Sequence, residues 1–459
     1  MRITPNRRSA LPLLLLLLLG ILPTEPNGIL LTQAKSLDDR EERRDILDND
    51  DGTRYDYCEA SHPMLTKYLD PRVRPQDTDM TWECDAYPGY LTFVDTKASQ
   101  LSNSITTAAV LANQVVTLPQ DSPFADYLWK GSCNTGQLTP KGADQQRRLG
   151  QDLRQIYIDR LKLLPGTFDP TAMHLRSTDV WRTKQSAENL MIGLYGQEAQ
   201  AQGQPQPVFQ IHTLPKEIDY MTMNTDRCPR IKEIIDAIKK KSEVLQQISR
   251  THATFQKQVN QIVLGSKQEQ NWENQDEDLV VMDLVDTILP RVCHDMPLQC
   301  VGGDDEHQEL RCLTKEMADE CLVIEAEGNA EMWRDAKGIH EMLQLGIGSL
   351  TRDIQKNFLE AAAPFLLYSG HDTTLLPLLG MLDSADMRWP PYASNLIFEL
   401  WSSPSKERFV RVLYNGRAVK TKSNWCDLEW CPLDTVVKYM GQFIVDNLGA
   451  RCKRHEQEF

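Results

Sequence analysis

FLLYSGHDTTL, residues 365–375, has the pattern of a buried strand that runs directly into a helix. Its apolar part, Phe365–Tyr368, is bounded by Pro364 and Gly370, as is typical of a strand buried on both faces. A helix that follows such a strand in an α/β sheet points its free N–H groups and positive dipole end at the crevice where ligands bind. We therefore predict an anion site at His371 and Asp372.

The types of these two residues suit one kind of chemistry. His371 can donate a hydrogen bond to a phosphoryl oxygen. Asp372, beside a dianion that raises its pKa, can stay protonated and give its proton to a leaving alcohol. A His-Asp pair also occurs where a helix is simply capped, so the dipeptide alone does not establish a site.

A second stretch, LRSTDVWRT at residues 175–183, repeats this arrangement. A short strand predicted over 173–176 ends at Arg176, and a helix is predicted from Thr183 to Tyr195. The planar fork of Arg176 suits bidentate contact with phosphate. Two strand-end sites, one cationic and one His-Asp, fit a phosphate pocket better than either does alone.

The remaining apolar patterns predict a helical insertion between these stretches and a closing α/β segment after them. Apolar residues at helical spacing over 231–262 predict one long amphipathic helix or a helical pair. A helix is also predicted over 346–358, a hairpin-like pair of strands over 396–400 and 409–414, and a closing helix over 434–448.

We therefore divide the chain into five segments. They are a signal peptide or signal anchor (1–28), an acidic flexible stalk (29–56), the first part of an α/β core (57–214), a helical, cysteine-containing cap insertion (215–350), and the second part of the core (351–459).

The charge of the chain bears on its partners. Its 459 residues carry a formal charge of −15, which opposes non-specific attraction to nucleic acid or to anionic lipid. We expect no nucleic-acid partner, and an anionic substrate needs a local cationic pocket.

The N-terminus has the pattern of an export signal. Arg2, Arg7 and Arg8 precede an apolar run over residues 10–22, which is long enough for a signal peptide and short for a membrane span. Cleavage near Gly28 and retention as a membrane anchor both remain open. The 11 cysteines fit an oxidising compartment, and their odd number leaves at least one thiol free or paired between chains. We predict a secreted protein or one in the Golgi or ER lumen.

Both strand-end stretches, together with several other segments, resemble the histidine acid phosphatases, the larger branch of the histidine phosphatase superfamily. The further segments are Cys133, GQLT at 136–139 with Gly142, WPPYA at 389–393, FELW at 398–401, VLYNG at 412–416 and CPL at 431–433. They are most similar to the lysophosphatidic acid phosphatase and phosphoxylose phosphatase subgroup.

The resemblance implies an α/β fold with a mainly parallel sheet flanked by helices and a helical cap inserted in the chain. It also implies hydrolysis of a phosphate monoester through a phosphohistidine intermediate, with no metal and no cofactor. Arg176 would be a phosphate-binding arginine, His371 a phosphate-binding histidine and Asp372 the proton donor. A lysophospholipid, a phosphorylated sugar and a general phosphate ester all remain possible substrates.

The chain departs from the family where the nucleophile should be. Arg-His-Gly-x-Arg-x-Pro occurs nowhere in the sequence. The segment expected to hold this motif, residues 57–80, has His62 as its only histidine. Either a short segment that includes a core strand is missing from the sequence as recorded, or the chain is a catalytically inactive pseudophosphatase that binds a phosphorylated ligand. We favour the first interpretation, because the apolar strand is absent together with the motif.

Overall fold

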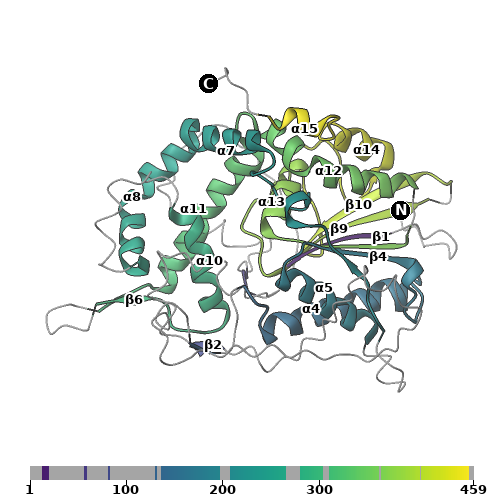
Figure 1. Ribbon diagram of the computed structural model, residues 1–459, viewed down its shortest axis with the longest axis horizontal. Helices are drawn as coiled ribbons and strands as arrows, with labels where there is room; N and C mark the ends of the chain where they lie inside the picture. Colours follow the sequence, from purple (N-terminus) through teal and green to yellow (C-terminus); the bar gives the residue numbers. More distant parts are fainter. Residues whose placement is uncertain are drawn as a thin grey trace.

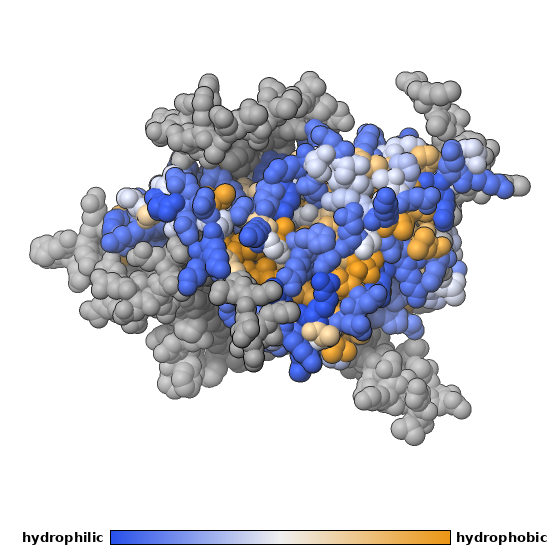
Figure 2. Space-filling model, turned by 90° about the horizontal axis from the view of Figure 1, so that it is seen from above, coloured by the Kyte–Doolittle hydropathy of each residue, from blue (hydrophilic) through white to orange (hydrophobic). Residues whose placement is uncertain are grey.

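The computed structural model describes residues 13–19, 56–58, 81–82, 130–131, 136–196, 207–264, 280–302, 310–360, 363–403 and 405–453. Figure 1 shows their arrangement, with a sheet and its covering helices on one side and a group of helices on the other. Seen from above, hydrophilic residues form most of the described surface, and hydrophobic residues appear in patches between them (Figure 2).

The central sheet is parallel on one side and antiparallel on the other. Its order is β11 (Arg417–Ala418), β10 (Arg408–Tyr414), β9 (Ala393–Ser402), β1 (Leu13–Leu19), β8 (Phe365–Ser369), β4 (Met173–Ser177) and β5 (Ile211–His212), and β12 (Cys431–Pro432) also pairs with β10. Four neighbouring strands, β1, β8, β4 and β5, run parallel to one another, whereas β9 is antiparallel to β1 and to β10. The predicted α/β fold and the predicted pairing of the last two long strands are confirmed.

β8 is buried on both faces, which explains its unbroken apolar sequence. Phe365 and Leu367 point into one hydrophobic cluster, which contains Leu190 and Leu194. Leu366 and Tyr368 belong to another cluster, which lies on the opposite face because side chains alternate along a strand. Each fully buried side chain of this size stabilises the fold by roughly 1.5–3 kcal/mol.

Helices cover the two faces of the sheet (Figure 1). On one face lie α4 (Pro140–Leu153) and α5 (Trp181–Met191), and on the other lie α12 (Ile339–Glu360), α13 (Asp372–Met381) and α14 (Leu433–Gly441). Close packing next to α5 requires glycine, because a Cβ on Gly150 would lie 2.1 Å from the carbonyl oxygen of Leu190, and one on Gly193 would lie 2.0 Å from that of Arg147. The predicted closing helix ends early, at Gly441, because the chain turns there and Asn447 adopts a left-handed conformation before the short α15 (Leu448–Arg451).

A second group of helices lies beside the sheet. It contains α7 (Pro229–Lys241), α8 (Glu243–Leu264), α10 (Val280–Cys293) and α11 (Lys315–Ala330). The amphipathic stretch over 231–262 is therefore a helical pair with a break at Ser242, which is one of the two predicted arrangements. The boundary at residue 350 stays a prediction, and α12 continues through it.

Shorter elements complete the fold. They are β2 (Thr81–Trp82) paired with β3 (Lys130–Gly131), β6 (Cys300–Val301) paired with β7 (Arg311–Cys312), the 3-10 turns η3 (Pro170–Ala172) and η5 (Lys216–Ile218), and the π-helical segments η2 (Arg154–Arg160), η4 (Ile192–Gly196) and η8 (Glu331–Asp335).

Disulfides connect distant parts of the chain. Cys58 pairs with Cys293, Cys228 with Cys452, Cys300 with Cys312 and Cys426 with Cys431. Among the described cysteines, Cys321 carries a free thiol, and burial raises its pKa to about 12. Such a thiol is unreactive at physiological pH, because the thiolate is the nucleophilic form.

The stretch predicted to be an export signal or anchor contains β1. Leu13–Leu17 pair in parallel with Phe365–Ser369, and β1 also pairs along its other edge with β9. In one molecule a segment cannot be both a central strand and a removed or membrane-embedded leader, so the leader role stays a prediction. None of the helices in the described ranges is long and apolar enough to cross a bilayer. The sheet thus has a strand position between β8 and β9 that needs an occupant.

We predict that deleting residues 1–28 lowers the melting temperature of the folded chain. The deletion leaves backbone groups of β8 and β9 without partners, and each buried unsatisfied group costs about 1–3 kcal/mol. Thermal unfolding monitored by circular dichroism should show the loss, and deletion of residues 29–55 serves as the control. An unchanged melting temperature without residues 1–28 would show that β1 contributes nothing.

Candidate active site

The two predicted strand-end sites lie side by side. β4 and β8 are adjacent and parallel, with Arg176 opposite Tyr368 and Ser177 opposite Ser369. Two hydrogen bonds join the chain beyond these ends: Thr178 N–H donates to the Ser369 carbonyl (3.1 Å), and the Ser369 hydroxyl donates to the Thr183 carbonyl (2.7 Å). The beginnings of α5 and α13 therefore face the same edge of the sheet.

His371 is held between two partners from the β4 side. It is 6% exposed, its Nε2 lies 2.9 Å from Thr178 Oγ1, and its Nδ1 lies 3.2 Å from Arg182 Nη2. A guanidinium can only donate, so Nδ1 accepts and Nε2 carries the proton that it donates to Thr178. Thr178 can then donate to Thr183 Oγ1 at 2.8 Å. This network sets one tautomer of the neutral imidazole.

Asp372 is the first residue of α13 and is 5% exposed. Its Oδ1 accepts a hydrogen bond of 2.6 Å from the backbone N–H of Thr373. Burial raises the pKa of Tyr392, in the WPPYA segment at 389–393, and the charges of Asp286 and Asp372 raise it further. The carboxyl group thus lies at a helix N-terminus, where the predicted anion site was placed.

Arg176, the predicted phosphate-binding arginine, makes a different contact. Its Nη2 lies 2.6 Å from Asp219 Oδ1, with both side chains buried, and its guanidinium lies 4.1 Å from the centre of the Tyr220 ring. Burial raises the pKa of Asp219, although the Met221 N–H and Arg176 act in the opposite direction. The charge of Arg176 is therefore already matched by a carboxylate.

Arg182, which contacts His371, was not among the site residues predicted from the sequence. The signal for it was its position: it is the second residue of α5, where a side chain can reach the anion site at the helix N-terminus. The two stretches are therefore connected by the contacts of His371 with Arg182 and Thr178. Arg176 instead forms an ion pair with Asp219.

The GQLT segment borders the same region. Gly136 has a positive φ of 65°, and a Cβ on it would lie 3.3 Å from Arg182 Nη1, so a side chain there would be strained and close to the guanidinium. Thr139 caps α4 by accepting from the Gly142 N–H (3.3 Å). His62, the histidine in the window expected to hold the nucleophile, lies outside the described residues.

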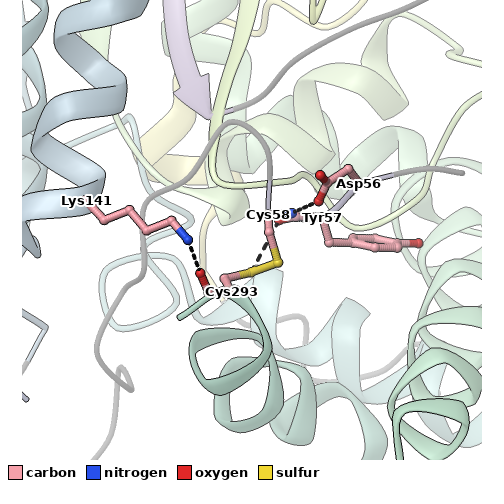
Figure 3. Close-up of a disulfide and its surroundings, with 5 residues drawn as sticks. All are labelled: Asp56, Tyr57, Cys58, Lys141 and Cys293. Carbon is pink, nitrogen blue, oxygen red and sulfur yellow. Dashed lines mark hydrogen bonds between the residues drawn. A yellow bond between two sulfur atoms is a disulfide. The ribbon is translucent and has the colours of Figure 1, made fainter. Parts of the chain in front are cut away.

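The start of α4 is tied to the end of α10. Lys141 Nζ donates to the Cys293 carbonyl at 2.5 Å, next to the Cys58–Cys293 disulfide (Figure 3). Thr139 Oγ1 also lies 3.2 Å from His294 Nε2. Burial and the neighbouring Lys141 charge lower the pKa of His294 to about 4. The second group of helices is thus fastened at the edge of the site.

The chain is similar to known proteins in sequence and in fold. The sequence profile described as histidine phosphatase superfamily (branch 2) matches residues 82–288 and 331–415. The chain is 27% identical over 336 residues to lysophosphatidic acid phosphatase type 6 of Pongo abelii, which covers 71% of this chain and 70% of that protein. It is 26% identical over 405 residues to human 2-phosphoxylose phosphatase 1, with 80% and 77% covered.

A solved structure shares the fold. The phytase of Klebsiella sp. ASR1 superposes with a TM-score of 0.51 at 16% identity and covers 70% of this chain and 89% of its own. At this identity the likeness concerns the fold alone. The resemblance stated from the sequence motifs is confirmed.

We predict that His294 makes the fold less stable in acid. Its pKa is lowered from 6.5 to about 4, so the unfolded chain binds the proton first as the pH falls below 6.5, and stability is lost from there down to about pH 4. Between pH 6.5 and 5 the loss is about 2 kcal/mol. Denaturant unfolding at the two pH values should show a smaller loss for His294→Gln than for the unmodified chain. The control, His340→Gln at an exposed histidine, should keep the full loss; equal losses in all three proteins would contradict the assignment.

Proposed function

This chain belongs to the histidine phosphatase superfamily (branch 2), and we propose that the ends of β4 and β8 bind the phosphoryl group of a phosphate monoester. The observation that carries the proposal is the contact of His371 with both Thr178 and Arg182. It brings a cation, an imidazole and two helix N-termini to one place, and helix N-termini and arginine side chains are groups that favour bound phosphate.

Arg182 and His371 are the proposed phosphate ligands. A phosphoryl oxygen that enters between them accepts from the guanidinium, and it also accepts from His371 once Nδ1 is protonated. Its negative charge favours that protonation, with the proton taken from the solvent.

Asp372 is the proposed proton donor to the leaving alcohol. Asp372 is the first residue of α13, and a dianion bound beside it would favour the protonated form of its carboxyl group. In the family reaction a histidine nitrogen forms a bond to phosphorus while the ester P–O bond breaks, and the leaving oxygen takes the proton of the acid. Water then releases phosphate from the histidine.

The chain as written has no Arg-His-Gly motif to perform the first of these steps. We propose that the catalytic form carries a strand ending in Arg-His-Gly-x-Arg-x-Pro at the position that β1 occupies here. The parallel register supports this, because Leu17 of β1 lies opposite Ser369, two residues before His371. A motif that follows a strand in this position would be delivered beside His371.

A second candidate function rests on the absence of that motif. Without a nucleophile the chain would bind a phosphorylated ligand without hydrolysing it, as an inactive pseudophosphatase. The substrate or ligand in either case is a phosphate monoester, and the names of two relatives point to a lysophospholipid or a phosphorylated sugar. The several disulfides support an extracellular or lumenal place of action.

We predict that Arg182→Ala weakens the binding of orthovanadate to the full chain. Loss of a charge-assisted contact worth about 1.5–3 kcal/mol corresponds to roughly a tenfold to hundredfold rise in Kd. Isothermal titration calorimetry measures the affinity, and Arg148→Ala, at an exposed arginine paired with Asp144, is the matched control. Equal affinity of the Arg182→Ala variant and the control would remove Arg182 from the site.

We also predict that the chain as written does not hydrolyse p-nitrophenyl phosphate between pH 4 and 7. A variant in which β1 is replaced by a strand ending in Arg-His-Gly-x-Arg-x-Pro should gain activity. Asp372→Asn in that variant should abolish turnover and leave vanadate affinity nearly unchanged, because the acid acts on the leaving oxygen. Activity of the unmodified chain would contradict the first statement. A stable but inactive replacement variant would favour the pseudophosphatase.

A further inference from the structure

The loop after η5 contacts residues near the ends of both β4 and β8. Asp219, Tyr220 and Met221 follow η5, and all three side chains contact groups from other elements. Asp219 is 3% exposed and Met221 is fully buried. A loop with a buried carboxylate at its centre needs a specific reason, because an unpaired charge there would be costly.

Hydrogen bonds connect this loop to both strand ends. Asp219 Oδ1 accepts hydrogen bonds from Arg176 Nη2 (2.6 Å) and from the Met221 N–H (2.9 Å). Arg176 is the next-to-last residue of β4. The Met221 carbonyl accepts from Thr374 Oγ1 at 2.5 Å, and Thr374 Oγ1 accepts from the backbone N–H of His371 at 3.1 Å. A continuous path of hydrogen bonds therefore runs from Arg176 to the backbone of His371.

Packing supports the same path. Gly370 precedes His371, and a Cβ on it would lie 2.9 Å from Thr374 Oγ1 and 3.3 Å from the terminal methyl carbon of Met221. The loop therefore lies directly against the turn that presents His371. The Tyr220 hydroxyl, by contrast, donates to Asp353 of α12 and so leads away from His371.

We propose that Asp219 is a positioning residue for His371, and that Arg176 acts through Asp219 and does not itself contact the phosphoryl group. This rests on the proposed function, because it assigns His371 to the phosphate site. Arg176 fixes the carboxylate, the carboxylate fixes Met221, and Met221 fixes Thr374 and the backbone of His371. The imidazole then lies in the one orientation in which Nδ1 faces Arg182 and Nε2 faces Thr178.

The tautomer of His371 in the ligand-free chain gives the most direct test. Nitrogen-15 NMR of the histidine-labelled full chain at neutral pH, with His371 assigned through His371→Gln, reports which ring nitrogen carries the proton. We expect the Nε2-protonated form in the unmodified chain and a mixture of tautomers in Asp219→Ala. Asp219→Asn keeps an acceptor oxygen for Met221 and should keep the single tautomer. Asp353→Ala is the matched control within the same group of residues and should also keep it.

Affinity for orthovanadate is the second measurement. Asp219→Ala and Thr374→Val should each raise Kd about tenfold, with no further rise in the double variant, whereas Asp219→Asn and Thr374→Ser should stay within about threefold of the unmodified chain. If Asp219→Ala fails to fold, Thr374→Val and Thr374→Ser replace it in both the tautomer and the affinity measurements.

Some outcomes would overturn the proposal. A single, unchanged tautomer in Asp219→Ala or in Thr374→Val would do so, and so would equal effects of Asp219→Ala and Asp219→Asn, because the charge alone would then matter. Failure of the proposed function is seen separately, since the unmodified chain would then bind no vanadate while the tautomer measurement still decides the role of Asp219.

Discussion

The parallel pairing of β4 with β8 is the constraint on which the site depends. It sets Ser177 opposite Ser369, and from this register the two helix starts, the Thr178–His371 contact and the Ser369–Thr183 bond all follow. A shift by one residue would turn every side chain of a strand to the other face. All five residues of β8 are buried, and such a shift would exchange the side chains that pack in the clusters on its two faces. The packing of apolar side chains therefore opposes the shift and also sets the positions of the polar groups at the strand ends.

Charged side chains are buried at the same edge of the sheet, and a buried charge needs an oppositely charged or hydrogen-bonding partner. Arg176 forms a buried ion pair with Asp219, whereas Arg182 Nη2 lies 3.2 Å from Nδ1 of His371. These two arginines, only six residues apart, therefore have different contacts. A chain with a formal charge of −15 can therefore still place an arginine beside two helix N-termini, which is the local arrangement that the proposed phosphate site needs.

The sequence predicted the parts of this arrangement that depend on local pattern. The buried strand before His371, the strand and helix around Arg176 and the helical pair after Ile231 each follow from spacing and composition, and the structure contains them. The Arg176–Asp219 pair was not predictable, because its partners lie 43 residues apart in the sequence and meet only through the order of the strands. The position of Arg182 near a helix start could have been inferred from the sequence. Nothing in the sequence says, however, which of the two nearby arginines pairs with a buried carboxylate. The strand role of residues 13–19 was also hidden, because a run of leucines fits an export signal, a membrane segment and a buried strand equally well.

The most direct test of a phosphate site without a nucleophile is a crystal structure of the full chain with orthovanadate. Vanadate is informative because a nucleophile in place forms a bond to vanadium, whereas binding groups only donate hydrogen bonds to its oxygens. We predict vanadate oxygens within hydrogen-bond distance of His371 and Arg182, Arg176 still paired with Asp219, and no bond between vanadium and any histidine nitrogen. A histidine nitrogen bonded to vanadium, or vanadate held by Arg176 with Asp219 displaced, would contradict this prediction.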